Sequence, residues 1–347
     1  MAEKARYHLQ KVTSSFRNWV GLRRQSISSY LKRRPHRSFR RTYVRDIPPR
    51  ASLPGNIFFT TAVLDFMRQN WRSYTLFTIL YIAAYAIFAG VATQENYTAL
   101  TESIQNLGPQ ILGGEVSQTT QAALLFGATI TGGVGAPQTE VQQGYVALLS
   151  ILTWLAVIWF ARHRYNGVSV KVRDALYNSG SPIVPTIILV LLALVQIVPA
   201  ALAVIVYMAA YSNGFLDIGV VAMLFGLGGI LLIILSLYWL CGTLLALVLV
   251  TLPGTYPYQA IKMASDIVIG RRVQLLLRLL WMAGAVVVFW ALLLVPVILI
   301  AGYITIEWLP IVPVTVQLLS ATTLMFSITY CYVLYRGMID ESIEPQR

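Results

Sequence analysis

Six apolar stretches dominate the sequence, and each is long enough to cross a lipid bilayer as an α-helix. A helix needs about 20 predominantly apolar residues to span roughly 30 Å of hydrocarbon. Of the 347 residues, 57% are hydrophobic and only 12% carry a formal charge. The sequence therefore predicts an all-α, polytopic integral membrane bundle of six transmembrane helices. We place these spans at about residues 74–93, 145–161, 183–211, 219–251, 276–302 and 311–335.

The basic residues predict how these spans are oriented. The connections at residues 94–144, 212–218 and 303–310 contain none of the 26 Lys and Arg residues. All of the basic residues therefore lie on one side, and cytoplasmic connections are the ones that are enriched in Lys and Arg. We expect both termini to face the cytoplasm. An even number of spans requires the same arrangement.

The chain divides into three regions. Residues 1–55 form a basic cytoplasmic arm that is partly amphipathic or disordered, residues 56–338 the membrane domain, and residues 339–347 a cytoplasmic tail. A short amphipathic segment precedes each outward-going span, which predicts three repeats of an interfacial helix followed by a helical hairpin. The extracytoplasmic connection of residues 94–144 is expected to be a surface loop, with a plug or re-entrant segment at residues 122–130 as the alternative.

The arm is the strongest indication of a binding function, because residues 1–50 hold 14 basic and 2 acidic side chains. Aromatic and aliphatic residues are interleaved with these charges. A basic segment gains about 1 kcal/mol per Lys or Arg beside an anionic membrane, so lipid headgroups are its first expected partner. RNA or ribosome contact and a purely topological role are the alternatives. The candidate residues for binding lipids or anions are Arg23, Arg24, Lys32, Arg33, Arg34, Arg37, Arg40 and Arg41.

Further candidates lie in the membrane domain. We expect Arg271, Arg272 and Arg278 at the cytoplasmic interface, with Arg278 about one turn inside the fifth span and able to snorkel to the surface. Pro199 and Pro296 each lie well inside an apolar run, where a proline kinks the helix. Helix packing is the commoner role of such prolines, and a hinge beside a transport path is the alternative.

The uncharged polar residues and glycines of the spans are expected to serve helix packing. We expect the polar residues to form side-chain hydrogen bonds between helices, with substrate contact as the alternative. We expect the glycines to let neighbouring helices approach closely. The polar residues are Gln196, Ser236, Gln317 and Ser320. The glycines are Gly226, Gly228, Gly229 and Gly242.

Groups that carry catalysis are scarce in this sequence. None of the three histidines has a Cys, Asp or Glu at metal-ligand spacing. The interior of the spans lacks the ionisable residues that intramembrane enzymes and proton-coupled transporters use. We therefore predict no enzymatic activity, no catalytic residue, no metal and no cofactor.

Residues 258–282 resemble a known family. The segment combines YQAIKMAS from Tyr258, GRR from Gly270 and LLLRLL from Leu275. This pattern resembles the polytopic membrane domain of bacterial glycerophosphodiester phosphodiesterases and of related uncharacterised six-span membrane proteins. The resemblance implies a six-helix bundle in the bacterial cell membrane, tied to lipid or envelope work. The catalytic domain of those enzymes has no counterpart here, so no hydrolase activity is implied.

Together these observations predict a non-enzymatic integral membrane protein, an envelope or membrane accessory or scaffold that binds anionic lipids through its arm. The alternative is a transporter or channel for a small or lipid-like solute. A protein partner or a homo-oligomer is compatible with both.

Overall fold

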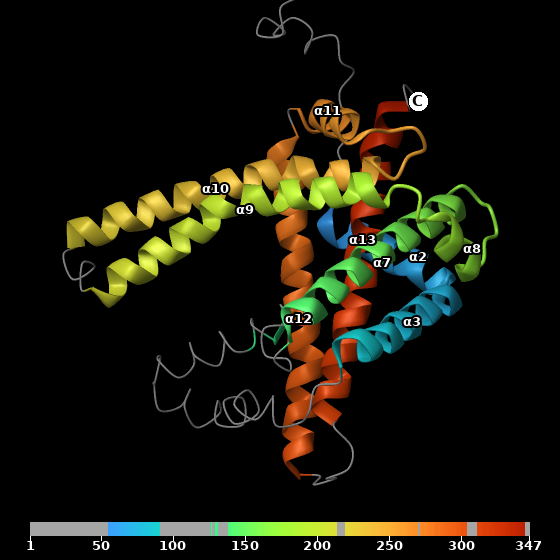
Figure 1. Ribbon diagram of the computed structural model, residues 1–347, viewed down its shortest axis with the longest axis horizontal. Helices are drawn as coiled ribbons and strands as arrows, with labels where there is room; N and C mark the ends of the chain where they lie inside the picture. Colours follow the sequence, from blue (N-terminus) through green and yellow to red (C-terminus); the bar gives the residue numbers. More distant parts are fainter. Residues whose placement is uncertain are drawn as a thin grey trace, which may run out of the picture. The chain divides into compact units, whose positions relative to one another are not determined.

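The computed structural model confirms the predicted all-α class, because every regular element in the part of the chain that it describes is a helix (Figure 1). Among the described residues, six helices are long and apolar enough to cross a membrane. They are α3 (Trp71–Ala89), α7 (Glu140–Tyr165), α9 (Ile183–Ser212), α10 (Gly219–Leu249), α12 (Arg272–Tyr303) and α13 (Ile311–Ile343). The described residues are 55–90, 126, 129–130, 138–213, 219–269, 271–303 and 311–343.

In the described part of the chain, the long helices follow one another in three pairs, and one shorter helix precedes each pair. The shorter helices are α2 (Asn56–Gln69), α8 (Val172–Asn178) and α11 (Pro257–Val268), so the order of one short and two long helices occurs three times. Each short helix buries an apolar stripe, as Phe59 and Val63 of α2 illustrate. In α11 the buried residues Ala260, Ala264 and Val268 are four positions apart, which places them on one helix face. The element order agrees with the predicted repeats.

Helix α7 is longer than its apolar run of residues 145–161, because polar residues form both of its ends. At the start, the Thr139 hydroxyl accepts the backbone N–H of Gln142 at 3.3 Å, and the Gln142 side chain accepts that of Thr139 at 2.9 Å. This capping box satisfies backbone donors that the helix itself cannot satisfy. At the other end, Arg162 and Arg164 extend the helix, where positive charge opposes the negative end of the helix dipole.

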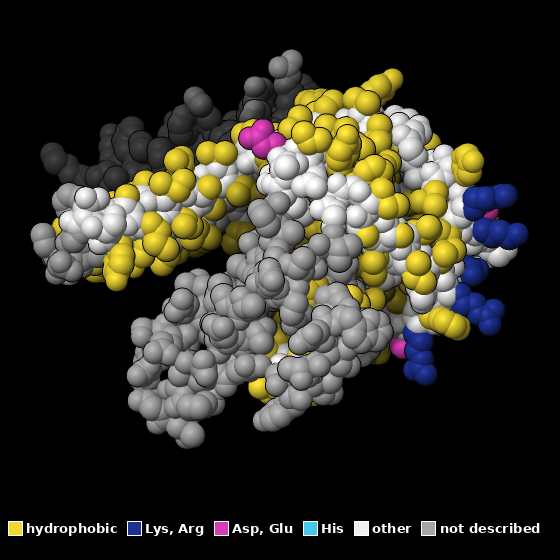
Figure 2. All heavy atoms as spheres, turned by 60° about the horizontal axis from the view of Figure 1, so that its bottom comes forward, with side chains coloured by type: hydrophobic (Ala, Val, Ile, Leu, Met, Phe, Trp, Pro, Cys, Tyr) yellow, Lys and Arg dark blue, Asp and Glu magenta, His cyan; other side chains and the backbone are white. Residues whose placement is uncertain are grey.

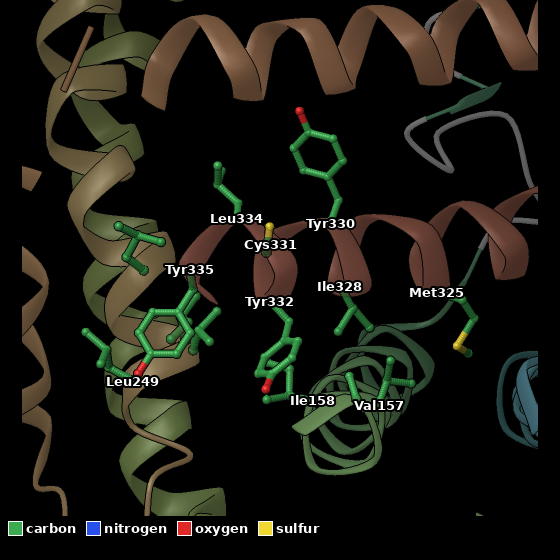
Figure 3. Close-up of a cluster of buried hydrophobic side chains, with 14 of the residues drawn as sticks. Val157, Ile158, Leu249, Met325, Ile328, Tyr330, Cys331, Tyr332, Leu334 and Tyr335 are labelled. Carbon is green, nitrogen blue, oxygen red and sulfur yellow. The ribbon is translucent and has the colours of Figure 1, made fainter. Parts of the chain in front are cut away.

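Helix α13 supplies much of the main buried cluster. Figure 3 shows Tyr332 directed toward Ile158 of α7 and Tyr335 toward Leu249 of α10, whereas Tyr330 points to the opposite side. On that side the Tyr330 ring meets Phe59 of α2 edge-on, with ring centroids 4.9 Å apart. Residues two apart on a helix point in nearly opposite directions, so α13 packs against the other helices on both faces.

A second buried cluster lies between the C-terminal half of α12 and the N-terminal half of α13. Trp290 is fully buried there, and its indole N–H donates to the Thr323 hydroxyl at 2.8 Å. Phe126 and Ile130, from the connection between the first two spans, pack against this cluster. Thr129 of the same predicted plug segment is buried, and the other residues of that segment lie outside the described part of the chain.

Helices α9 and α10 run side by side as a hairpin (Figure 1). Pro199 lies inside the continuous helix α9, where the nearby Ala200 N–H donates to the Ser236 hydroxyl of α10 at 3.0 Å. The Thr243 hydroxyl of α10 donates to the Gln196 side-chain oxygen at 2.6 Å. Both polar side chains of the hairpin that we singled out from the sequence therefore bond across its two helices, as expected.

Only one of the four glycines singled out in α10 faces a neighbouring helix among the described residues. A Cβ atom added at Gly229 would lie 3.9 Å from the Cβ of Ala203, which is an ordinary contact. Cβ atoms added at Gly226, Gly228 and Gly242 would have no described atom within 4 Å. No neighbouring helix in the described part of the chain therefore requires glycine at these three positions.

Candidate anionic-lipid interface

The described Lys and Arg residues gather at one end of the spans. They lie at the end of α2, at the starts of α3 and α12, near the ends of α7 and α13, and in the segments that join α7 to α9 and α10 to α12. The described opposite ends of the same helices contain none. The predicted orientation depends on this distribution. The cytoplasmic location of these residues stays a prediction.

Four exposed basic side chains form what we call the basic rim: Arg68, Arg72, Lys171 and Arg173. Arg68 and Arg72 flank the junction of α2 and α3, and the other two lie at the start of α8. Helix α8 packs against α3 and α7, which brings both pairs to the same part of the bundle. Figure 2 shows Lys and Arg side chains along one edge of this face, next to a surface that is largely hydrophobic.

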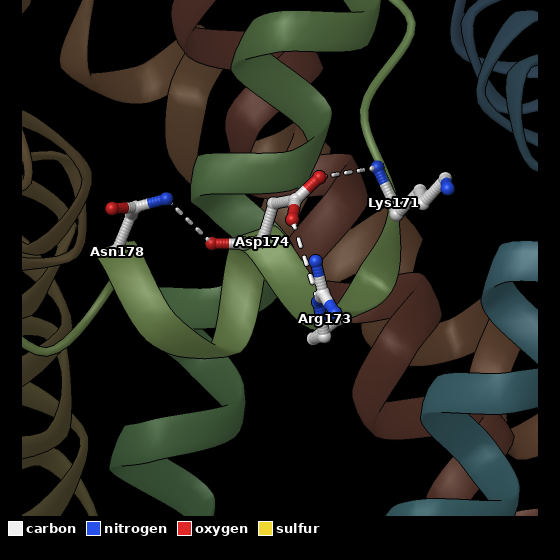
Figure 4. Close-up of polar contacts among 4 residues, drawn as sticks. All are labelled: Lys171, Arg173, Asp174 and Asn178. Carbon is white, nitrogen blue, oxygen red and sulfur yellow. Dashed lines mark hydrogen bonds and ion pairs between the residues drawn. The ribbon is translucent and has the colours of Figure 1, made fainter.

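Local hydrogen bonds fix the geometry of the rim at α8 (Figure 4). The Asp174 carboxylate accepts the backbone N–H of Lys171 at 3.3 Å and so caps the start of the helix. The same carboxylate lies 3.9 Å from Nε of Arg173, and the two side chains are 41% and 79% exposed. An ion pair this long and this exposed contributes at most about 1 kcal/mol. Arg173 therefore stays available to an external anion.

Exposed aromatic side chains accompany the rim. Trp71 and Tyr177 are both exposed, and the Arg72 guanidinium lies 5.6 Å from the centre of the Trp71 ring. Trp and Tyr favour the headgroup level of a bilayer, because one part of each ring system is apolar and the other forms hydrogen bonds. Basic and aromatic side chains thus occur together, the combination that favours the headgroup level of a bilayer.

Other arginines at this end of the bundle are engaged inside the protein. Arg162 donates to the Thr251 carbonyl at 2.9 Å and also to the Thr251 hydroxyl, just beyond the end of α10. A cation at this place opposes the negative end of the α10 dipole. The Arg336 guanidinium lies 5.0 Å from the centre of the Tyr165 ring. These contacts join α7 to α10 and α13, so they serve the packing of the bundle.

The interface residues predicted in the third repeat lie in different environments. Arg278 does not reach the surface as expected, since it is 5% exposed and its guanidinium lies 5.0 Å from the Phe59 ring of α2. Helix α2 covers it, and Trp281 donates to Thr60 of α2 at 3.1 Å. Arg271 and Arg272 are half-buried. The cause of the difference is the docking of α2, which the local sequence around Arg278 does not reveal.

Several predicted residues are not tested by this geometry. All eight arm candidates, from Arg23 to Arg41, lie outside the described residues. Pro199 and Pro296 both lie inside continuous helices, and their role as hinges stays a prediction. Gln317 differs from Gln196 and Ser236, because its side-chain Nε2 is buried without a hydrogen-bond partner.

Within the described ranges, no group of three or more His, Cys, Asp or Glu residues could hold a metal ion. The two cysteines, Cys241 and Cys331, are buried in the bundle. That the protein is not an enzyme stays a prediction.

Fold and composition define the class of the molecule: it is a multi-pass integral membrane protein. Comparison with known protein families, with curated proteins and with solved structures found no match. The resemblance of residues 258–282 to the phosphodiesterase membrane domain thus stays an expectation from sequence.

Proposed function

We propose that the protein is a non-enzymatic accessory or scaffold of the cell membrane that binds anionic lipid headgroups through its basic arm and basic rim. The observation that carries this proposal is the rim itself. Its four basic side chains are exposed beside exposed Trp71 and Tyr177, next to the ends of membrane-spanning helices. In this proposal the rim faces the cytoplasmic leaflet of a bacterial membrane.

The charges of the rim are sufficient for a measurable preference. At about 1 kcal/mol per basic residue near an anionic surface, four residues contribute about 4 kcal/mol if their effects add. This corresponds to roughly a thousandfold in an equilibrium constant. The weak pair of Arg173 with Asp174 offsets only a small part of it. The arm adds further basic residues directly before α2.

A transporter is the second candidate, and one observation favours it. The buried, unbonded Nε2 of Gln317 is the kind of polar group that a solute path would use. Against it, Gln196 and Ser236 beside Pro199 are occupied by contacts between α9 and α10. Because these contacts explain the polar residues near Pro199 without a solute, the accessory function is preferred.

The test is lipid binding by the purified full-length protein, measured by native mass spectrometry with added phosphatidylglycerol or phosphatidylcholine. A variant with Arg68→Gln, Arg72→Gln, Lys171→Gln and Arg173→Gln should bind anionic lipid at least about tenfold more weakly. The matched control carries Arg68→Lys, Arg72→Lys and Arg173→Lys, which keep every charge, and should behave like the unmodified chain.

Substituting glutamine for the eight arm candidates tests the arm in the same way. The rim proposal fails if the glutamine variant of the rim binds phosphatidylglycerol as well as the lysine control does. A bound protein partner, RNA or a second copy of the chain would appear in the same spectra as added mass. A preference for one of these over anionic lipid would contradict the proposed function.

A further inference from the structure

One basic residue of the bundle lies away from the rim, at the start of α12 and beside α10. The Arg272 guanidinium lies over the Tyr238 ring of α10, 4.2 Å from its centre. Arg272 is the first residue of α12, whereas Tyr238 precedes the end of α10 by 249 − 238 = 11 residues. Eleven residues of helix measure about 16 Å. The charge is therefore held beside α10 well before the end of that helix.

No carboxylate on either helix balances this charge. Neither α10 nor α12 contains an Asp or Glu residue, and α10 reads LSLYWLC from Leu235 to Cys241. Tyr238 supplies the aromatic contact of Arg272, and Cys241, about one turn further along α10, lies within range of its charge. The Tyr238 ring attracts the guanidinium but does not cancel its positive charge. The position therefore calls for an anionic ligand.

The geometry leaves Arg272 able to bind one. A guanidinium that lies over an aromatic ring keeps N–H donors along its edge, and these match two oxygens of a phosphate. The phenol of Tyr238 is a further donor on the same residue that carries the ring. Tyr238 is 47% exposed and the neighbouring Trp239 is 44% exposed, so this edge of the bundle is open to its surroundings. For a membrane-spanning helix those surroundings are lipid.

We propose that Arg272 and Tyr238 form a binding site for the phosphate of an anionic phospholipid, where α10 packs against α12. An anionic lipid is favoured over a zwitterionic one because a choline group would bring a second positive charge beside Arg272, and neither α10 nor α12 carries a carboxylate. The site deepens the proposed function, on which it rests for the class of ligand. It is separate from the basic rim, which lies on α2, α3 and α8.

The experiment is native mass spectrometry of the purified full-length protein with phosphatidylglycerol, phosphatidylcholine or glycerol 3-phosphate. Arg272→Gln should weaken the first phosphatidylglycerol by about tenfold, the effect of losing one bidentate charged contact. Arg272→Lys keeps the charge but loses the planar fork, and Tyr238→Phe keeps the ring but loses the hydroxyl. Both should weaken binding by a few-fold. Lys262→Gln on α11 removes the same charge from an exposed position and should leave this binding unchanged.

The possible outcomes separate this site from the rim. If Arg272→Gln and Lys262→Gln weaken binding equally, net charge alone acts and the site is refuted. If only the rim variant loses phosphatidylglycerol, the proposed function stands and this inference fails. If glycerol 3-phosphate competes as well as the lipid does, the ligand is a soluble phosphate. If no variant or wild-type chain prefers phosphatidylglycerol, both proposals fall. Tyr238→Phe provides the decisive comparison should Arg272→Gln impair folding.

Discussion

Helices α7 and α13 and the hairpin of α9 and α10 differ sharply in burial. In their most apolar stretches, 39% of the residues of α7 and of α13 are buried, compared with 11% in α9 and 6% in α10. The hairpin is nevertheless the more apolar pair. Burial inside this protein therefore does not follow apolar content, in contrast to the usual pattern of a soluble domain.

Polar groups explain this inverse relation. In a bilayer, a polar group needs a partner from the protein itself, whereas an apolar side chain is equally well accommodated by lipid. The Tyr74 hydroxyl of α3 bonds to that of Thr329 of α13 at 2.9 Å, and the Trp154 indole of α7 donates to the Leu247 carbonyl at 3.3 Å. Spans with such groups pack against the protein, and the α9–α10 hairpin leaves most of its surface to lipid.

The largest effect should come from one substitution made in both regions. Ile328 of α13 is 0% exposed and Ile230 of α10 is 55% exposed. We expect Ile328→Ala to lower the free energy of unfolding by about 2–4 kcal/mol, because it leaves a cavity. Ile230→Ala should change it by less than about 0.5 kcal/mol. Denaturant-induced unfolding in detergent, followed by circular dichroism, measures both. Equal losses at the two positions would mean that α10 is buried against protein.

A smaller effect is expected for the hydroxyl pair that joins α3 to α13. Tyr74→Phe and Thr329→Val should each lower the free energy of unfolding by about 1 kcal/mol. Combined in a double-mutant cycle, they should show a coupling of roughly 0.6 kcal/mol, the average for hydrogen bonds in membrane bundles. Strictly additive losses would show that the hydroxyl pair does not stabilise the packing of α3 on α13.

The smallest effect should come from the hairpin's own polar pair. Thr243→Val removes the donor to Gln196, and we expect a loss of about 0.5 kcal/mol or less. Since the bond joins only α9 and α10, amide hydrogen exchange should increase in these two helices and stay unchanged in α13. Faster exchange throughout the bundle would indicate that the hairpin stabilises the other spans, contrary to the comparison.

The sequence was sufficient to predict the helical class, the six spans and the order of short and long helices. These features follow from local patterns, since a run of apolar residues is visible without knowledge of its neighbours. The capping box of Thr139 and Gln142 extends α7 beyond its apolar run, and a hydropathy count does not detect it. Span ends were therefore less well predicted than span centres.

The site was harder to predict, because it depends on contacts between distant residues. Arg278 is buried by Phe59, which is 278 − 59 = 219 positions earlier in the chain. The contact of Arg272 with Tyr238 likewise joins two different hairpins. The basic residues of the rim were recognised as charges on one side of the membrane, but their exposure beside Trp71 and Tyr177 needed the structure. The eight arm residues are known from sequence alone.

The central claim, that the rim binds anionic lipid, is tested most directly by the lipids that the protein retains from its own membrane. Native mass spectrometry after gentle extraction should compare the unmodified chain with the glutamine and lysine variants of the rim. We predict that the unmodified chain and the lysine variant retain more anionic lipid than the bulk membrane contains, and that the glutamine variant does not. Bound lipids that match the bulk membrane in all three would contradict the claim.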